Sequence, residues 1–374
     1  MRKNTLFIII FVIILTFLSG VLLFVRKESS QTIKTSLLKQ WNRKFIRTDL
    51  KKSFVVSKKN HHQLTVLSES QGYGMLIAAN EGLEKIHSVQ AKKQFQQLDN
   101  YYLANRYGGT HLMSWKQIIS LEKKRLKKFK NNATDGDLYL AYSLIQAAKA
   151  WPQNAVSYRQ QAKLILQDIL KYDYNPKSGL LTVGNWATSN KRAQNLLRTS
   201  DVLPKQFTAF YHLTGNRIWL KIKYRMLAEL LSLSQQHKTG LLPDFAWINS
   251  KGAVAVAPKT VSSKYDGVYY YNACRLPYNL AQSSDSQSQR ILNKMMKFFM
   301  QKKFISGGYR LNGQKLNDYQ SASFGAPIFY AALNNSKYNK LIQQEKYIFM
   351  QKLMPNNYYQ SALIVLTLFN PNFR

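Results

Sequence analysis

Beyond residue 30, apolar residues recur at intervals of three and four positions in one segment after another. This spacing predicts helices, and the alternation that is typical of strands is nearly absent. Glycine, proline and asparagine separate the segments, as they do in turns. Twelve helices in one domain indicate an all-α fold of six helical hairpins closed into a ring. The predicted helices span residues 33–44, 69–86, 88–104, 135–150, 155–172, 201–214, 217–237, 271–282, 286–302, 321–333, 336–351 and 357–368.

An almost wholly apolar stretch, Thr5 to Val25, precedes these helices and has basic residues at both ends. About 20 apolar residues at ~1.5 Å each span the ~30 Å core of a bilayer, which predicts an uncleaved anchor. A cleaved signal peptide is the alternative, although the apolar run continues past the small residues Ser19 and Gly20. The expected organisation is a cytoplasmic N-terminus at 1–4, a transmembrane anchor at 5–25, a basic linker at 26–45 and one domain at 46–374.

The charge of the chain is strongly unbalanced, with 54 Lys and Arg against 18 Asp and Glu and a formal net charge of +36. Such a field attracts polyanions, whether nucleic acid, anionic lipid or an anionic cell-wall polymer. No nucleic-acid-binding motif accompanies the charge, so nucleic acid is not an expected partner. The densest basic run, residues 123–130, is interpreted as a solvated helix face, with contact to an anionic polymer or membrane surface as the alternative.

The chain has one cysteine, Cys274, so no intrachain disulfide forms, and we expect a small buried residue there. Cys-x-x-Cys pairs and histidine pairs at metal-ligand spacing are absent from the sequence. His61 and His62 are adjacent and are interpreted as an exposed segment. We therefore expect neither a metal nor another cofactor.

Because acidic residues are scarce, their placement is informative. Glu69 lies in the segment Ser68–Met75, where Gly72 and Gly74 fall inside a predicted helix. Each glycine costs a helix about 1 kcal/mol, which suggests close approach by another backbone or by a ligand. The alternative is a capping box formed by Ser68 and Gln71, which would make Glu69 an ordinary first-turn residue.

A second acidic segment has Asp135 and Asp137 on either side of Gly136. Thr134 and Asp137 could cap a helix, but two carboxylates at a helix start exceed what a cap needs.

A third segment runs from Asp266 through a cluster of tyrosines to Asn272 and Arg275. An aromatic loop that docks on the core is one interpretation. A sugar-binding cleft is the other, since it uses flat aromatic faces for pyranose rings and polar groups for hydroxyls.

The segment Ala133–Trp151 closely resembles the signature of glycoside hydrolase family 8, which comprises inverting endoglucanases, chitosanases, lichenases and xylanases. It reads Ala-Thr-Asp-Gly-Asp, followed by Leu-Ala-Tyr-Ser-Leu and a later Trp. Three further pieces fall in family order: Ser68–Met75, Leu112–Lys116 and Tyr271–Pro277. The resemblance implies an (α/α)6 barrel, in agreement with the twelve helices.

The resemblance also implies roles for single positions. Glu69 is similar to the family's general acid, and Asp135 to the carboxylate that holds and distorts the sugar at the cleavage point. Trp115 resembles a stacking platform, and Arg275 resembles the arginine that braces the site. The remaining substrate-binding positions that it suggests are Tyr73, Asp137, Asp201, Tyr271 and Asn272.

One position departs from the common family pattern. Many members have Asp as general base where this chain has Asn272. Another branch has Asn there and takes its base from the preceding loop, and Arg198–Asp201 also resembles that branch. The loop offers Asp266, which we assign as the base, with Asp244 further off. The alternative for Asp266 is a turn residue, because Asp-Gly is a common turn dipeptide.

Together these residues predict an inverting, endo-acting hydrolase of a β-glucan with β-1,4 or mixed linkages. A chitosanase is an alternative, although a basic domain should repel polycationic chitosan. A glycan-binding protein that has lost its base is another. The expected partners are the polysaccharide, the membrane through the N-terminal helix, and anionic cell-wall polymers. The expected location is the cell membrane with the domain outside the cytoplasm, or the medium if the N-terminal segment is cleaved.

Overall fold

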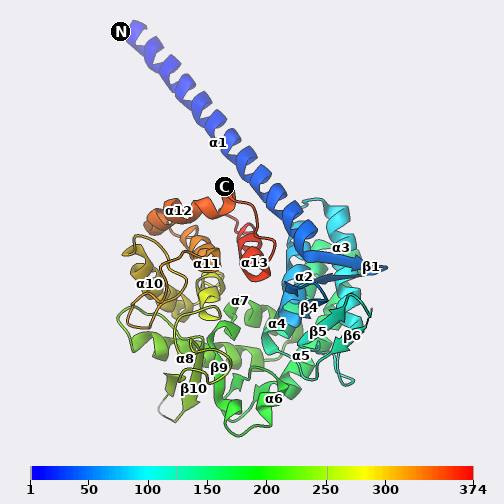
Figure 1. The fold of residues 1–374 in the computed structure, drawn as a ribbon. Coiled ribbons are helices and arrows are strands. Elements are labelled where there is room, and N and C mark those ends of the chain that lie inside the picture. Colours follow the sequence, from blue (N-terminus) through cyan, green and yellow to red (C-terminus); the bar gives the residue numbers. More distant parts are fainter. Residues whose placement is uncertain (1, 124, 251, 374) are drawn as a thin grey trace.

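The computed structural model describes residues 2–123, 125–250 and 252–373; in the first helix, side chains are described at 7–22 and 29–45. The inner helices surround the centre of the domain (Figure 1). Each contacts the next, and the last contacts the first, so the ring is closed. In order, the inner helices are α2 (Ser68–Leu83), α4 (Thr134–Ala150), α7 (Pro204–Thr214), α9 (Leu276–Ala281), α11 (Ala322–Ala332) and α13 (Tyr358–Thr367).

An outer helix packs against each inner one. The outer helices have one buried stripe, as the three- and four-residue spacing predicted, whereas α2, α4, α11 and α13 are buried on nearly all sides. The predicted mostly helical, closed ring of six helical pairs is confirmed, although the sixth pair joins the two ends of the chain and is not a hairpin. The outer partners of α2, α4, α7, α9, α11 and α13 are, respectively, α3 (Ser88–Ala104), α5 (Ala155–Tyr172), α8 (Ile218–Gln235), α10 (Ser286–Met300), α12 (Asn339–Glu345) and the last part of α1 (Arg2–Phe45).

Several helices are shorter than predicted, and three of them show why. α7 begins at Pro204 instead of residue 201, because proline lacks an N–H and suits the first turn of a helix. α9 likewise has Pro277 in its first turn, where the spacing predicted a helix from residue 271. α12 is a short helix between 3-10 turns at Ser336–Tyr338 and Lys346–Met350.

Small antiparallel sheets at the rim of the ring are a feature that the sequence did not predict. Their strands have two to five residues, too few to show a clear alternation. The sheets have the orders β3-β4-β5-β6, β11-β10-β9, β1-β2 and β7-β8. The strands are β1 (Ile46–Asp49), β2 (Lys52–Val55), β3 (Lys58–Lys59), β4 (Gln63–Leu67), β5 (Lys116–Ser120), β6 (Leu126–Lys128), β7 (Tyr174–Asn175), β8 (Leu180–Leu181), β9 (Leu196–Arg198), β10 (Phe245–Asn249) and β11 (Gly252–Ala255).

The last part of α1 belongs to the barrel. Leu37, Leu38, Trp41 and Phe45 are buried. The predicted helix 33–44 lies within this part of α1, and its apolar side chains complete the sixth helical pair, so the barrel includes residues that were assigned to the linker 26–45.

The first part of α1 projects away from the domain (Figure 1). Its apolar side chains between residues 7 and 22 are exposed, with Phe7 at 76% and Leu22 at 70%. The side chains of the predicted N-terminus 1–4 and of both ends of the predicted anchor lie outside the described ones. Among the residues that the structure describes, no helix has the length and apolar character of a membrane span.

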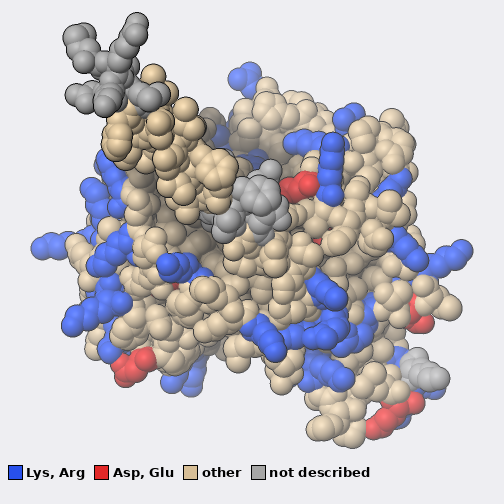
Figure 2. All heavy atoms as spheres, turned by 90° about the horizontal axis from the view of Figure 1, so that it is seen from above, with Lys and Arg blue, Asp and Glu red and all other residues tan. Residues whose placement is uncertain are grey.

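Lys and Arg are spread over the face from which α1 projects and do not form a single patch (Figure 2). The basic run 123–130 contains the exposed strand β6, so the expected helix face is wrong. Cys274 is buried, as predicted. His62 is exposed, as predicted, and its ring lies 2.5 Å from Glu122.

Candidate active site

Two carboxylates meet where the inner helices α2 and α4 begin. Glu69 and Asp135 are the second residues of these helices. A Cβ atom at Gly136 would lie 2.8 Å from the backbone nitrogen of Glu69, and one at Gly72 would lie 2.8 Å from the Cβ of Tyr139. Real Cβ atoms do not come so close, so only glycine permits this contact between the helices. The close approach inferred from Gly72 is confirmed, whereas a Cβ atom at Gly74 would meet the side chain of Val55 and not another backbone.

The four-stranded sheet places Trp115 beside Glu69. β4 leads directly into α2, and its last residue pairs with the first residue of β5. The N–H of Ser68 donates to the carbonyl of Trp115 at 3.0 Å. The indole is 38% exposed and is free to meet a sugar ring. The capping role of Ser68 and Gln71 is not observed, since the hydroxyl of Ser70 accepts from the N–H of Leu67 instead.

Arg275 joins the two carboxylates. Its Nη1 atom lies 2.8 Å from Glu69 Oε2 and 3.4 Å from Asp135 Oδ2. Its Nη2 atom donates to the hydroxyl of Ser200 at 2.7 Å, and Nη1 also donates to the hydroxyl of Tyr73 at 3.0 Å. The guanidinium is buried, so these contacts fix its position.

Asp135 is held in its ionised form. Burial alone would raise its pKa, but Arg198, whose Nη1 atom lies 2.5 Å from Asp135 Oδ2, and Arg275 lower the pKa to about 2. The other oxygen accepts from the backbone N–H of Gly136 at 2.9 Å. The site therefore contains a fixed negative charge beside Glu69.

The pKa of Glu69 is shifted in the opposite direction from that of Asp135. Burial is the largest influence and raises its pKa, and the charge of Asp135 acts in the same direction. Arg275 and the hydroxyl of Tyr358, which donates to Glu69 Oε1 at 2.9 Å, oppose the shift. Although a helix N-terminus also favours the ionised form, burial dominates. A carboxyl with a raised pKa next to an ionised one is the arrangement that acid catalysis requires.

Asn272, at the usual base position, is held in a single orientation. Its Oδ1 atom accepts from Arg275 Nη2 at 3.3 Å, and its Nδ2 atom donates to Asp244 Oδ2 at 3.2 Å. The reverse orientation would set the amide nitrogen against a guanidinium and the amide oxygen against a carboxylate. Asp244 also accepts from the backbone N–H groups of Tyr270, Asn272 and Ala273, and burial raises its pKa to about 6.

The assignment of Asp266 as base does not fit its position. Its carboxylate accepts from the backbone N–H groups of Val261, Ser262 and Ser263 at 2.7, 3.0 and 3.0 Å, and the residue is 1% exposed. The carboxylate is thus directed into its own loop and is shielded from water. The turn interpretation of Asp266 describes this geometry.

Three residues that were expected to bind substrate lie behind the surface of the site. Tyr73 and Asp137 are fully buried, and Asp201 is 2% exposed. Asp137 accepts from the N–H of Met113 at 2.8 Å and from the amide of Asn132 at 2.9 Å, so it links α4 to neighbouring loops. We correct their role from direct contact to support of the site. Tyr271 and Asn272 are partly exposed and remain available to a ligand.

Sequence reasoning missed two groups that touch the carboxylates of Glu69 and Asp135. Arg198 pairs with Asp135, and its only signal was its place in a segment that resembles the family. Tyr358 contacts Glu69 from a position 289 residues away, and the local sequence around it has no feature that indicates this role.

The sequence matches the family described as glycosyl hydrolases family 8 over residues 17–371. The chain belongs to this family. Among family 8 relatives, a β-glucanase of Niallia circulans is 32% identical over 286 residues, which cover 72% of this chain and 68% of the relative. An endoglucanase of a Bacillus strain is 28% identical over 336 residues, covering 84% of this chain and 70% of that one.

Solved structures agree with family 8 membership. The structure of a β-1,3-1,4-glucanase from a Paenibacillus species superposes with a TM-score of 0.83 at 26% identity, and the match covers 91% of each chain. A xylose complex of Rex8A from Paenibacillus barcinonensis superposes with a TM-score of 0.71 at 20% identity, covering 92% of this chain and 94% of that one, and shows the shared fold. The family 8 fold is thus the (α/α)6 barrel that the resemblance implied.

Proposed function

We propose that this family 8 enzyme hydrolyses internal β-glycosidic bonds of a β-glucan with inversion of configuration. The observation that carries the proposal is the Glu69 carboxyl, whose pKa is raised by burial beside the ionised Asp135. The β-glucanase and endoglucanase relatives support a β-glucan with β-1,4 or mixed linkages.

In the proposed reaction, Glu69 donates its proton to the oxygen of the scissile bond. Positive charge develops on the sugar ring as that bond breaks, and the fixed charge of Asp135 stabilises it. Trp115 offers an exposed aromatic face to a neighbouring sugar. Because Arg275 contacts both carboxylates, it fixes the position of Glu69 relative to the negative charge of Asp135.

For the opposite face of the sugar we propose a base made of two residues, Asn272 and Asp244. As water attacks, its proton passes to Asn272 Oδ1 while the Nδ2 proton of the same amide passes to Asp244 Oδ2. The attacking oxygen forms the new bond, the water proton ends on Asn272 Oδ1, and the former Nδ2 proton ends on Asp244, so Asn272 is left as the imidic acid tautomer. The amide is restored when Asp244 returns its proton to Nδ2 and the Oδ1 proton passes to solvent water. The 3.2 Å contact between the amide and the carboxylate supports this route, as does the pKa of about 6 for Asp244.

The acid is tested by Glu69→Gln, which keeps the shape and removes the proton. Reducing-sugar release from barley β-glucan should fall by at least ~10²-fold with oligosaccharide binding retained. Glu81→Gln is the matched control, since Glu81 lies buried on the same helix and burial raises its pKa to about 8. Carboxymethylcellulose, xylan and chitosan tested in parallel define the substrate. A Glu69→Gln enzyme that keeps most of its turnover on β-glucan would contradict the assignment.

The base is tested by Asn272→Ala. We expect kcat to fall by ~10²-fold or more while the melting temperature stays near that of the wild type. Asp266→Asn should leave proton transfer intact, because its carboxylate faces its own loop. If Asp266→Asn abolishes turnover and Asn272→Ala does not, the original assignment of Asp266 is right and the two-residue base is wrong.

We further propose that residues 5–25 anchor the enzyme in the cell membrane, with the barrel outside the cytoplasm and its basic surface near anionic lipids or wall polymers. The exposed apolar side chains of α1 support the anchor, because water is a costly environment for them. Sequencing the N-terminus of the native protein from the membrane fraction should find this segment intact. A mature chain in the medium that begins between residues 20 and 30 would show a signal peptide instead.

A further inference from the structure

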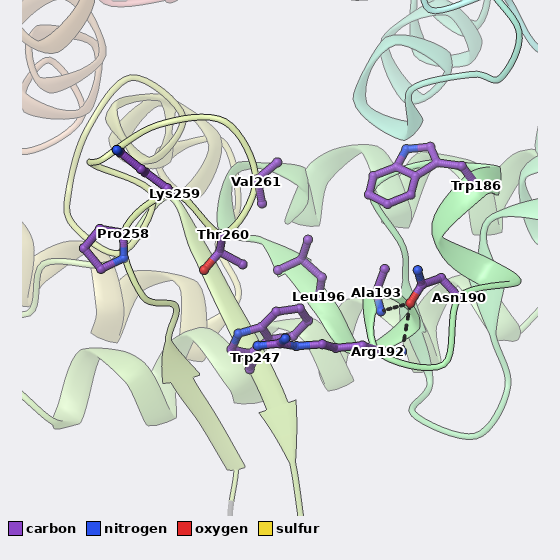
Figure 3. A pocket seen from close by; sticks show the side chains of 10 residues that line it. All are labelled: Trp186, Asn190, Arg192, Ala193, Leu196, Trp247, Pro258, Lys259, Thr260 and Val261. Atoms are coloured by element: carbon purple, nitrogen blue, oxygen red, sulfur yellow. Dashed lines mark hydrogen bonds between the residues drawn. The ribbon is translucent and has the colours of Figure 1, made fainter.

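A pocket of about 560 Å³ opens on the rim of the barrel, where Leu196 of β9 and Trp247 of β10 line it. Trp186 stands on one side of it, the loop of Pro258 to Val261 stands on the other, and Trp247 and Arg192 lie along its floor (Figure 3). Its volume falls within the range of ~300–1,000 Å³ that is usual for ligand sites. Neither the acid, the base nor the brace of the proposed reaction lines it.

The pocket and the catalytic site share one face of the sheet formed by β9 and β10. Arg198 pairs with Phe245, and two positions further along Leu196 pairs with Trp247. Residues two apart on a strand point to the same face and lie about 7 Å apart. The side chains of Leu197 and Ala246 face the main core, whereas Leu196 and Phe245 belong to a separate small cluster under the pocket. A polysaccharide that passes Arg198 can therefore continue into the pocket.

The aromatic residues of the pocket suit a sugar ring. Trp186 is 43% exposed, and Trp247 is partly exposed. Flat rings of this kind stack on the apolar faces of pyranoses, while Asn190 and Thr260 supply polar groups at the margin.

The pocket also carries positive charge, which binding of a neutral sugar would not require. Arg192 and Lys259 both line it, and no carboxylate is among the described residues of its lining. The guanidinium of Arg192 lies 4.9 Å from the centre of the Trp247 ring, which directs it along the floor. Neither cation has an ion-pair partner in the described part of the chain.

Asp266 holds the pocket loop that contains Lys259 in a fixed conformation. Its carboxylate accepts from the N–H of Val261, which lines the pocket, and from the next two N–H groups of the loop. Lys259 has a left-handed backbone with φ of 60°, which is uncommon for a residue with a side chain. Its N–H donates to the carbonyl of Ser263 at 2.8 Å, which closes the loop. The fold thus maintains a strained conformation at the residue that contributes a charge to the pocket.

We propose that this pocket is a substrate subsite for a sugar residue that carries a negatively charged substituent, a carboxylate or a phosphate ester. Trp186 and Trp247 contact the ring, and Arg192 and Lys259 bind the anionic group. The inference rests on the proposed glucan hydrolysis and narrows its substrate to an acidic β-glucan.

The test measures binding and hydrolysis separately. Calorimetry on the Glu69→Gln enzyme compares a neutral cello-oligosaccharide with carboxymethylated and phosphorylated forms of the same length. We expect the anionic forms to bind roughly tenfold more tightly, about the effect of one charge-assisted hydrogen bond. The better of the two anionic forms identifies the substituent. Arg192→Gln with Lys259→Gln should abolish the difference.

The control is Arg290→Gln with Lys297→Gln, which removes the same charge from exposed positions on α10. Equal binding of neutral and anionic forms, or an equal loss in the control, would overturn the subsite. Hydrolysis by the wild type of carboxymethylcellulose and of neutral hydroxyethylcellulose separates the two proposals. If neither polymer is cleaved but the binding preference holds, the hydrolytic proposal fails and the subsite stands. If both are cleaved and no binding preference exists, only the subsite fails.

Discussion

Tyr358→Phe is a direct probe of the acid, because the hydroxyl of Tyr358 donates to Glu69 Oε1 at 2.9 Å. The substitution removes that donor and leaves the ring in place. A donor to an ionised carboxylate favours the ionised form, so its loss should raise the pKa of Glu69 further. A general acid works in its protonated form, and activity is lost as pH rises through its pKa. The alkaline limb of kcat/KM should therefore move to higher pH.

The size of the shift follows from the kind of hydrogen bond that is lost. A hydrogen bond to a charged group contributes about 1.5–3 kcal/mol, and one between neutral groups about 0.5–1.5 kcal/mol. The hydroxyl can bond to Glu69 in either protonation state, so only the difference counts, about 1–1.5 kcal/mol. At ~1.36 kcal/mol per pKa unit, the limb should move by about one unit.

The assay is the pH profile of kcat/KM on barley β-glucan. Tyr359→Phe is the matched control, because the hydroxyl of Tyr359 donates to the backbone carbonyl of Tyr271 at 2.5 Å. The control should keep the wild-type alkaline limb. A Tyr358→Phe profile that stays in place or moves to lower pH would refute the reasoning that links this hydroxyl, the carboxyl and the acid role.

Asp135→Asn should move the same limb to lower pH and also lower kcat, because it removes a negative charge that raises the pKa of the acid; an unmoved limb would contradict this coupling. Gly136→Ala should destabilise the fold by about 1–3 kcal/mol and lower kcat, whereas Gly74→Ala should cost similar stability, by thermal denaturation, with kcat kept. Removal of residues 1–28 should leave a folded, active enzyme. Removal of residues 1–45 should unfold the enzyme, because it deletes the buried side chains of Leu37, Leu38, Trp41 and Phe45. Their burial contributes ~1.5–3 kcal/mol each, which together is comparable to a typical total stability of ~5–15 kcal/mol. Circular dichroism measures whether the helices are lost.

The outer helices were predictable because each has a repeating apolar stripe that local sequence displays in full, and the inner helices because their long apolar runs exceed the length of a strand. Gly72 was equally informative, since a glycine inside a helix lowers helix stability and the close packing of α2 on α4 explains its presence. The small sheets were not predictable, because strands of two to five residues are too short to establish a period.

The roles of the acidic residues depended on contacts between distant parts of the chain. Asp244 and Asp266 are both buried loop carboxylates, and only the fold shows that Asp244 contacts Asn272 while Asp266 binds its own loop. Tyr358 reaches Glu69 across 289 residues of sequence, a distance over which no local pattern carries information. Family resemblance pointed to Glu69 as the candidate acid, but the residues that shift the pKa of Glu69 could be identified only from the three-dimensional arrangement.

The continuity of α1 limits how far an anchored enzyme could reach. The helix has 44 residues, and at ~1.5 Å each it forms a rod of about 66 Å. Ile33, which packs against the barrel, follows the predicted membrane segment by eight residues, a rise of only about 12 Å. This short, rigid connection holds the barrel close to the lipid surface, whereas a flexible linker would let the barrel move away from it. If residues 5–25 anchor the enzyme as proposed, its working zone would be the layer of substrate next to the lipid surface, and polymers farther from the membrane would be beyond its reach.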